Sequence, residues 1–261
     1  MIAETSLDSP VAILGAGRLG RALARALGAR GAEVTLLRGR EEGRVPPVRL
    51  LVLAVSDDAL RAVAARIAGS LRGAAPVALH LAGALDSSVL SPLRAAGCAA
   101  GSCHPLQTFP DAESSPEAFQ DVTFGVEGDA RAVEAAEALV RRLGARSVIV
   151  APGKKTLWHL AAVLAGNGAV ALVGAAVDAM RGAGLTERQA LDALAPLARR
   201  SLEGALLRGP AAALSGPVAR GDEETLDAHR GALDAWDPAR RALYEALVAE
   251  QRRLVARNGD S

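Results

Sequence analysis

The feature that most constrains the fold of this chain is a glycine-rich turn between a strand-like run and a helix-like segment. The stretch VAILGAGRLGRALARAL, residues 11–27, places Gly15, Gly17 and Gly20 in the spacing G-x-G-x-x-G. In this context the first glycine permits a tight turn, the second lets backbone approach a pyrophosphate, and the third lets the helix pack on the strand. The motif therefore predicts a βαβ unit that binds a dinucleotide. The alternative is a glycine-rich turn in an α/β domain that binds none.

Short apolar runs alternate with helix-length segments over the first 150 residues. RLGRALARALGA after the first run and DALRAVAARIAG after the third are examples of such segments. This alternation indicates right-handed crossovers and a mostly parallel sheet with helices on both faces. We predict strands at 11–17, 32–37, 49–55, 75–82, 97–103, 122–128 and 146–150.

Strand-like runs stop after Pro152, and helical patterns follow. Thr186, Asp222 and Asp237 are predicted N-caps. We predict helices at about 154–182, 186–207, 222–233 and 238–256, with a Gly/Pro-rich connection at 207–222. The expected fold is a Rossmann-type α/β domain at 11–152 followed by an all-α domain at 153–257, with short tails at 1–10 and 258–261.

The composition excludes several classes of function. The 261 residues carry a net charge of +1 and no long basic run, so we expect no nucleic-acid surface. Two cysteines are too few for a disulfide framework and the N-terminal sequence has no secretory pattern, so we expect a cytoplasmic protein. The uncharged stretch 160–177 just reaches the length of a membrane span. Because it is rich in Ala and Gly and contains Asn167, we predict a buried helix and no membrane span.

The end of the second predicted strand distinguishes NAD from NADP. An NAD site has Asp or Glu there to bind the ribose 2′-hydroxyl. This sequence has Leu37, which cannot accept a hydrogen bond, followed by Arg38 and Arg40, which would attract a 2′-phosphate. NADP is therefore predicted, with two solvated loop arginines as the alternative. The predicted cofactor residues are Gly15, Ala16, Gly17, Arg18, Leu19, Gly20, Arg38, Arg40, Val55, Ser56, Ala82 and Gly83.

The fifth predicted strand ends in GSCHPLQTF. Because open α/β sheets bind ligands beyond the carboxyl ends of their strands, Ser102, His104 and Gln107 are expected near the nicotinamide. A metal site of His80, Cys103 and His104 is an alternative. Its spacing lacks the paired ligands of zinc sites, so we predict no metal.

The chain has only two lysines, Lys154 and Lys155, at the start of the first predicted helix after Pro152. At about 100° per residue, Lys155 and His159 share one face of that helix and Asn167 lies further round. A polar stripe on an otherwise apolar helix suggests a site for a small molecule. The alternative is a lysine that extends to solvent at the helix start and a core histidine that bonds a carbonyl.

Several segments together resemble a family of predicted bacterial oxidoreductases with a Rossmann-like domain and a helical C-terminal domain of unknown function. They are ILGAGRLG, LHLAGAL, GSCHPLQTF, GKKTLWHLAAVLAGN and LSGPVARGDEETLDAH. This family is similar to the 6-phosphogluconate dehydrogenase-like superfamily, which includes ketopantoate reductase and pyrroline-5-carboxylate reductase. The resemblance implies a helical domain of that superfamily's type and a homodimer formed through it.

The resemblance also implies a catalytic lysine near the start of the long helix, a position that Lys155 matches. The chain departs from the superfamily pattern at His159, where an asparagine is expected, at Val163, where ketopantoate reductases have a second one, and at Ala82, where serine is expected.

From these patterns we predict an NADPH-dependent oxidoreductase that reduces a small carboxylate-bearing ketone or imine, with a 2-oxo acid such as ketopantoate as the leading substrate. Lys155 would donate a proton to the developing alkoxide or stabilise it by its charge, and His159 or His104 would orient the substrate or relay the proton. The predicted substrate-binding residues are Ser102, Gln107, Asn167 and Arg220, the last as a carboxylate anchor. The alternative from another class is a sensor that binds NADP(H) without catalysis.

Overall fold

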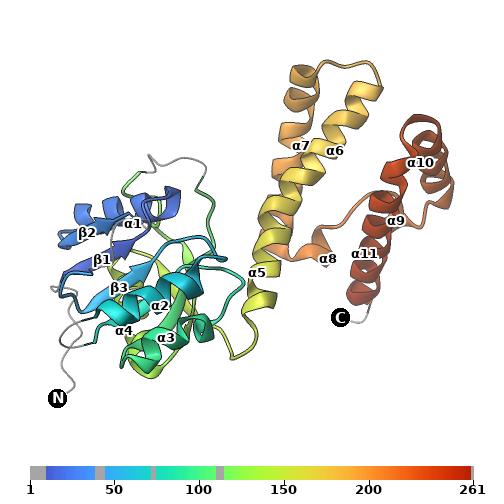
Figure 1. Ribbon diagram of the computed structural model, residues 1–261. Helices are drawn as coiled ribbons and strands as arrows, with labels where there is room; N and C mark the ends of the chain where they lie inside the picture. Colours follow the sequence, from blue (N-terminus) through green and yellow to red (C-terminus); the bar gives the residue numbers. More distant parts are fainter. Residues whose placement is uncertain (1–9, 39–44, 72–74, 110–114, 260–261) are drawn as a thin grey trace. The chain divides into compact units, whose positions relative to one another are not determined.

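The computed structural model describes residues 10–38, 45–71, 75–109 and 115–259, shown in colour in Figure 1. Arg40, one of the predicted cofactor residues, lies outside these ranges. The chain divides into two compact units, one up to Asn167 and one from Gly168 onward. The domain boundary expected from the sequence followed residue 152. The first turns of the long helix thus group with the sheet rather than with the helices that follow.

The first unit contains one seven-stranded sheet in the order β2-β1-β3-β4-β5-β6-β7. All neighbouring strands are parallel except β5 and β6, which are antiparallel. The predicted mostly parallel Rossmann-type sheet is confirmed. Its strands are β1 (Val11–Leu14), β2 (Val34–Leu37), β3 (Leu50–Leu53), β4 (Val77–His80), β5 (Ala99–Pro105), β6 (Thr123–Gly128) and β7 (Arg146–Ile149).

Each face of the sheet is covered by its own helices (Figure 1). One core joins α1 (Arg18–Ala29) and α4 (Ala130–Arg142) to alternate strand residues such as Ile13 and Val52. The other core joins α2 (Leu60–Ser70), η1 (Ser87–Leu90) and α3 (Ser91–Ala95) to the strand residues that point to the opposite face of the sheet, such as Leu14 and Leu53. Strands buried on both sides read as the continuous apolar runs seen in the sequence.

The predicted helix from 154 to 182 forms as α5 (Lys155–Val163), a π-helical turn η2 (Leu164–Gly168) and α6 (Ala169–Gly182). The expectation that its apolar middle is buried is wrong for the single chain. Only 6% of its most apolar window is buried, and Leu157, Leu164 and Val170 are more than half exposed. Length and composition alone would allow this helix to cross a membrane, which is weak evidence by itself.

The second unit is helical, as predicted. It consists of α6, α7 (Glu187–Arg208), α8 (Pro210–Ala213), α9 (Pro217–Arg220), α10 (Glu223–Trp236), η3 (Pro238–Arg240) and α11 (Arg241–Gly259). Thr186 caps α7 through a reciprocal capping box with Gln189, and the Asp222 carboxylate accepts from the Thr225 N–H. Asp237 occupies the N-cap of η3 without a side-chain cap bond. The predicted connection at 207–222 contains the short helices α8 and α9.

Candidate active site

The three glycines of the turn have three different environments. Gly15 has φ of +122°, and a Cβ there would overlap the Ala54 carbonyl oxygen. A Cβ at Gly20 would overlap the carbonyl oxygen of Gly15, so these two glycines bring strand, turn and helix into close contact. Gly17 is exposed, and a Cβ there would meet nothing within 4 Å. The turn is therefore closed on its inner side and open at Gly17, at the N-terminus of α1.

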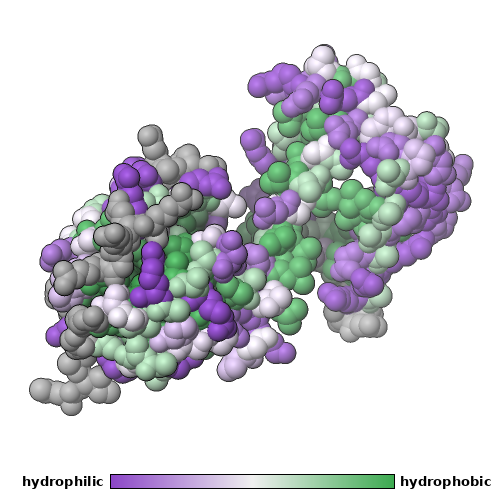
Figure 2. Space-filling view, in the orientation of Figure 1, coloured by the Kyte–Doolittle hydropathy of each residue, from purple (hydrophilic) through white to green (hydrophobic). Residues whose placement is uncertain are grey.

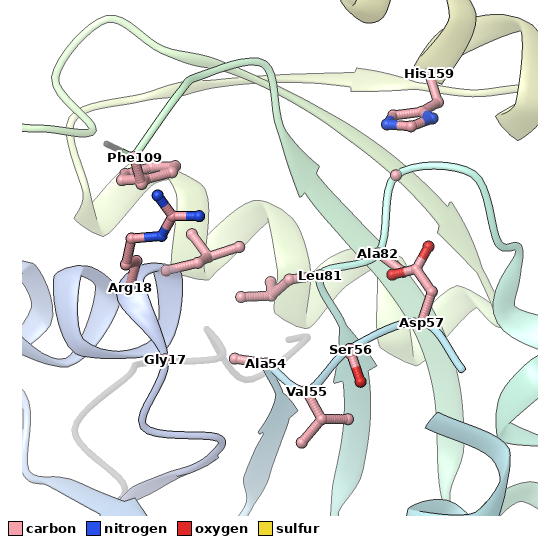
Figure 3. A pocket seen from close by; sticks show the side chains of 12 residues that line it. Gly17, Arg18, Ala54, Val55, Ser56, Asp57, Leu81, Ala82, Phe109 and His159 are labelled. Atoms are coloured by element: carbon pink, nitrogen blue, oxygen red, sulfur yellow. The ribbon is translucent and has the colours of Figure 1, made fainter. Parts of the chain in front are cut away.

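An open cleft of about 390 Å³ begins at this turn. Figure 3 shows Arg18 and Phe109 at one end of the view and His159 above Ala82 at the other. The cleft lies at the ends of β1, β3 and β4, where a parallel sheet binds ligands. Its lining residues are Gly17, Arg18, Leu19, Ala54, Val55, Ser56, Asp57, Leu81, Ala82, Gly83, Phe109 and His159.

Most of the predicted cofactor residues lie in or directly around this cleft. Gly15, Ala16 and Gly20 form the turn beneath it without lining it, and Arg38 is an exposed residue at the end of β2. Asp57, Leu81 and Phe109 also line the cleft and are not among the predicted cofactor residues. Phe109 carried a usable signal, because it is one of only three phenylalanines in the chain and follows the strand-end motif GSCHPLQT.

His104 and His159 meet beside Gly83, on the loop after β4. Their ring centroids are 5.7 Å apart at an interplanar angle of 81°. A Cβ at Gly83 would overlap the His159 ring and would lie 2.9 Å from His104 Nε2. Glycine at this position therefore lets two imidazoles from β5 and α5 approach the wall of the cleft. Burial and the positive charge of Lys155 lower the pKa of His104 to about 3.

His80 is a structural histidine. Its Nε2 lies 3.2 Å from the carbonyl oxygen of Asp86, and its Nδ1 accepts from the Ala82 N–H at 3.2 Å. Burial lowers the pKa of His80 to about 4, so the neutral ring holds the loop that carries Ala82 and Gly83. Among the described residues, no group of three or more His, Cys, Asp or Glu side chains is placed to hold a metal ion.

The two lysines have opposite environments. Lys154 is exposed, whereas Lys155 is 2% exposed and its Nζ has no hydrogen-bond partner within the described chain. Burial lowers the pKa of Lys155, opposed by the negative charge of Glu127. Ser102 pairs with Glu127 in the sheet and also has a buried hydroxyl without a partner. Neither Lys155 nor Ser102 lines the cleft. Their expected contacts with substrate stay a prediction.

Of the other predicted substrate residues, Gln107 and Asn167 belong to the first unit and do not line the cleft. Gln107 is exposed and its side chain accepts from the Thr108 N–H. Asn167 is exposed on the π-helical turn η2. Arg220 belongs to the second unit, where its guanidinium lies 3.6 Å from the Asp222 carboxylate. Within the first unit, the structure thus brings His104 and His159 together, whereas Gln107 and Asn167 do not line the cleft beside them. The role of Arg220 stays a prediction.

Comparisons with known proteins agree with this architecture. Residues 122–251 match the family described as a domain of unknown function, DUF2520. No curated protein matches the sequence.

Three solved structures cover nearly the whole chain. A predicted NADP oxidoreductase of Bacteroides fragilis has 23% identity and a TM-score of 0.76, over 95% of this chain and 99% of its own. A reductive aminase of Aspergillus terreus, bound to NADPH, cyclohexanone and allyl amine, has 18% identity and a TM-score of 0.64, over 94% and 95%. The pyrroline carboxylate reductase of Plasmodium falciparum, with NADP bound, has 11% identity and a TM-score of 0.59, over 95% and 98%. At these identities the similarity shows the fold.

Proposed function

We propose that this protein is an NADP(H)-dependent oxidoreductase that reduces a small carboxylate-bearing ketone or imine. The observation that carries the proposal is the composition of one continuous cleft. It begins at the open glycine, Gly17, and ends at Gly83 and His159. A groove with a phosphate-binding turn at one end and an imidazole at the other suits a dinucleotide that presents its reactive ring to a substrate.

The turn fits a pyrophosphate. The space over Gly17 would accept phosphate oxygens, and the N-terminus of α1 offers N–H groups and the positive end of the helix dipole. Arg18 lines the same end of the cleft. Arg38 follows β2, where a 2′-phosphate of NADP would be bound, and Leu37 supplies no acceptor for the 2′-hydroxyl of NAD.

Bound NADPH would supply the hydride. His159 faces the cleft and is the candidate to bind or protonate the oxygen or nitrogen that gains negative charge during reduction. Lys155 is the other candidate for this group, either as a proton donor or through its charge, and Arg220 is the candidate carboxylate anchor. A 2-oxo acid such as ketopantoate is the leading ketone. The imine is supported by the similar structures, since a reductive aminase and a pyrroline carboxylate reductase share the fold.

We further propose that a second copy of the chain covers the apolar surface of α5 and α6. Figure 2 shows hydrophobic side chains at the surface along this helix, and Leu164 and Val170 are 64% and 73% exposed. Contiguous apolar surface of this kind is typical of an interaction site. The proposed assembly is a homodimer.

Calorimetric titration tests the cofactor. NADPH should bind at least about tenfold more tightly than NADH, which corresponds to about 1.4 kcal/mol. Arg38→Ala should narrow that difference, and equal affinities in the wild type would refute NADP preference.

The absorbance of NADPH then tests turnover against a panel of 2-oxo acids, including ketopantoate, and cyclic imines. Consumption of NADPH with one class identifies the substrate chemistry. Tight NADPH binding without turnover of any compound would instead favour the sensor.

A further inference from the structure

Trp158 of α5 reaches from the helix that carries His159 to the strand that carries His104. It belongs to the first turns of α5, next to His159 in the chain, and its indole covers Gly125 of β6. A Cβ at Gly125 would lie 2.6 Å from Trp158 Nε1, so glycine is needed there for the indole to fit. Gly125 is the sheet partner of His104. The indole therefore sits over the strand pair at the position where His104 projects.

The indole nitrogen of Trp158 determines which nitrogen of the His104 ring carries the hydrogen. Trp158 Nε1 lies 3.3 Å from His104 Nδ1. An indole N–H can only donate, so Nδ1 must be the accepting, unprotonated nitrogen. An imidazolium carries hydrogen on both nitrogens and could not accept this bond. The contact therefore selects the neutral ring with its hydrogen on Nε2.

The Nε2–H of His104 points toward Gly83. Its position is given by the 2.9 Å distance to a Cβ built on Gly83, which lines the cleft together with His159. Among the described residues no side chain or carbonyl accepts from this Nε2. Gly83 and the edge-on His159 ring, which both line the end of the cleft, thus lie directly against the Nε2 side of His104, which does not itself line the cleft.

We propose that Trp158 is a positioning residue that holds His104 as a neutral Nε2–H donor to the substrate oxygen or nitrogen, leaving proton transfer to His159. A neutral imidazole can polarise a carbonyl by hydrogen bonding without giving up its proton. The proposal rests on the proposed function and divides the roles of the two histidines. The surroundings of His104 agree with a neutral ring, because burial and the charge of Lys155 oppose a positive charge there.

Nitrogen-15 NMR of the histidine side chains tests the tautomer without cofactor or substrate. In the wild type, His104, assigned by its loss in His104→Gln, should show a protonated Nε2 and an unprotonated Nδ1 from pH 5.5 to 8.5. Trp158→Phe keeps a ring but removes the donor, and should give a mixture of tautomers. Gly125→Ala should have the same effect by displacing the indole. The matched control is Trp236→Phe, in the second unit, which should leave the His104 signals unchanged.

Steady-state kinetics, with a substrate identified from the panel of 2-oxo acids and cyclic imines, tests the role of Trp158 in catalysis. Trp158→Phe should lower kcat about tenfold with little change in the KM for NADPH. His104→Gln, whose amide nitrogen can replace Nε2, should keep more activity than His104→Asn, whose nitrogen replaces Nδ1. A wild-type His104 protonated on Nδ1 would overturn the proposal, as would equal activity in Trp158→Phe and wild type. A fixed tautomer in a protein that never oxidises NADPH would refute the proposed function and leave the indole's positioning effect standing.

Discussion

At the scale of single residues, Gly17 and Gly20 of the glycine turn have different roles, one in binding and one in folding. Gly17 has φ of −72°, which any residue adopts, and open space beside it, whereas Gly20 touches the backbone of Gly15. Alanine at the two positions should therefore have different effects, although both belong to one motif.

We expect Gly17→Ala to keep or raise the free energy of unfolding, by up to about 1 kcal/mol, because alanine restricts the unfolded chain. It should weaken NADPH binding at least about tenfold by filling the space for the pyrophosphate. Gly20→Ala should instead lower the free energy of unfolding by about 1–3 kcal/mol through overpacking. Urea unfolding and calorimetric titration of both variants check this. Equal loss of stability in the two would contradict the geometry.

A second residue-scale prediction concerns Lys155. Its amine has no partner and its pKa is lowered by burial from a normal value of 10.5. Above the folded pKa and up to about 10.5, the unfolded chain binds more protons, so the free energy of unfolding rises with pH in that range. The cost of Lys155 is thus largest at low pH.

Lys155→Met should raise the free energy of unfolding by about 1–3 kcal/mol at pH 7 and reduce the rise with pH. Lys154→Met, at an exposed neighbour, is the matched control and should change neither. Urea titrations between pH 6 and pH 10 provide the measurement. A destabilised Lys155→Met would show that the amine has partners in solution.

Some of these residues could be predicted from the sequence and others could not. Gly15, Gly17 and Gly20 were assigned from spacing, because their roles are local and follow from a single turn. Trp158 was missed, because its contact joins residues 54 positions apart on a strand and a helix. Lys155 was recognised as unusual, but periodicity gives the face of a helix and not the depth of burial.

At the scale of elements, strands and helices were predicted well where hydrophobic pattern and capping agree. All seven strands form, since each is a short apolar run between turn residues. The π-helical turn at 164–168 was not predicted, because LAGNG is compatible with an α-helix. The α7 N-terminus was predicted from Thr186, whose capping box is present.

This cap gives a quantitative prediction. Thr186→Ala removes the acceptor for the Gln189 N–H and should lower the free energy of unfolding of the helical unit by about 1 kcal/mol. Asp192→Ala, which removes an exposed i,i+4 ion pair with Arg188 on the same helix, should cost about 0.3–0.5 kcal/mol. Circular dichroism in urea compares the two. A Thr186→Ala variant as stable as wild type would show that this end of α7 frays in solution.

At the scale of the whole molecule, large apolar side chains of the helices remain exposed in a single copy of the chain. The second unit has a small hydrophobic core, formed by Val218, Leu226 and Val248 with Tyr244 packed against them. Leu206 and Leu207 of α7 are 86% and 78% exposed. The sequence analysis predicted the stretch 160–177 as buried, because hydrophobicity shows that a surface avoids water but not whether the same chain covers it.

A homodimer through α5 and α6 would bury these exposed apolar side chains. A stable interface needs about 800 Å² from each partner and a core of apolar side chains, which this surface would supply. Sedimentation velocity should give twice the 26.6 kDa chain mass for the wild type. Leu164→Glu and Val170→Glu should shift it to monomer by placing charges in the interface. Arg61→Glu, on an exposed position of α2, is the control and should remain dimeric. A monomeric wild type in aqueous buffer would contradict the dimer, and a protein that requires detergent and partitions into vesicles would assign the apolar helix to a membrane.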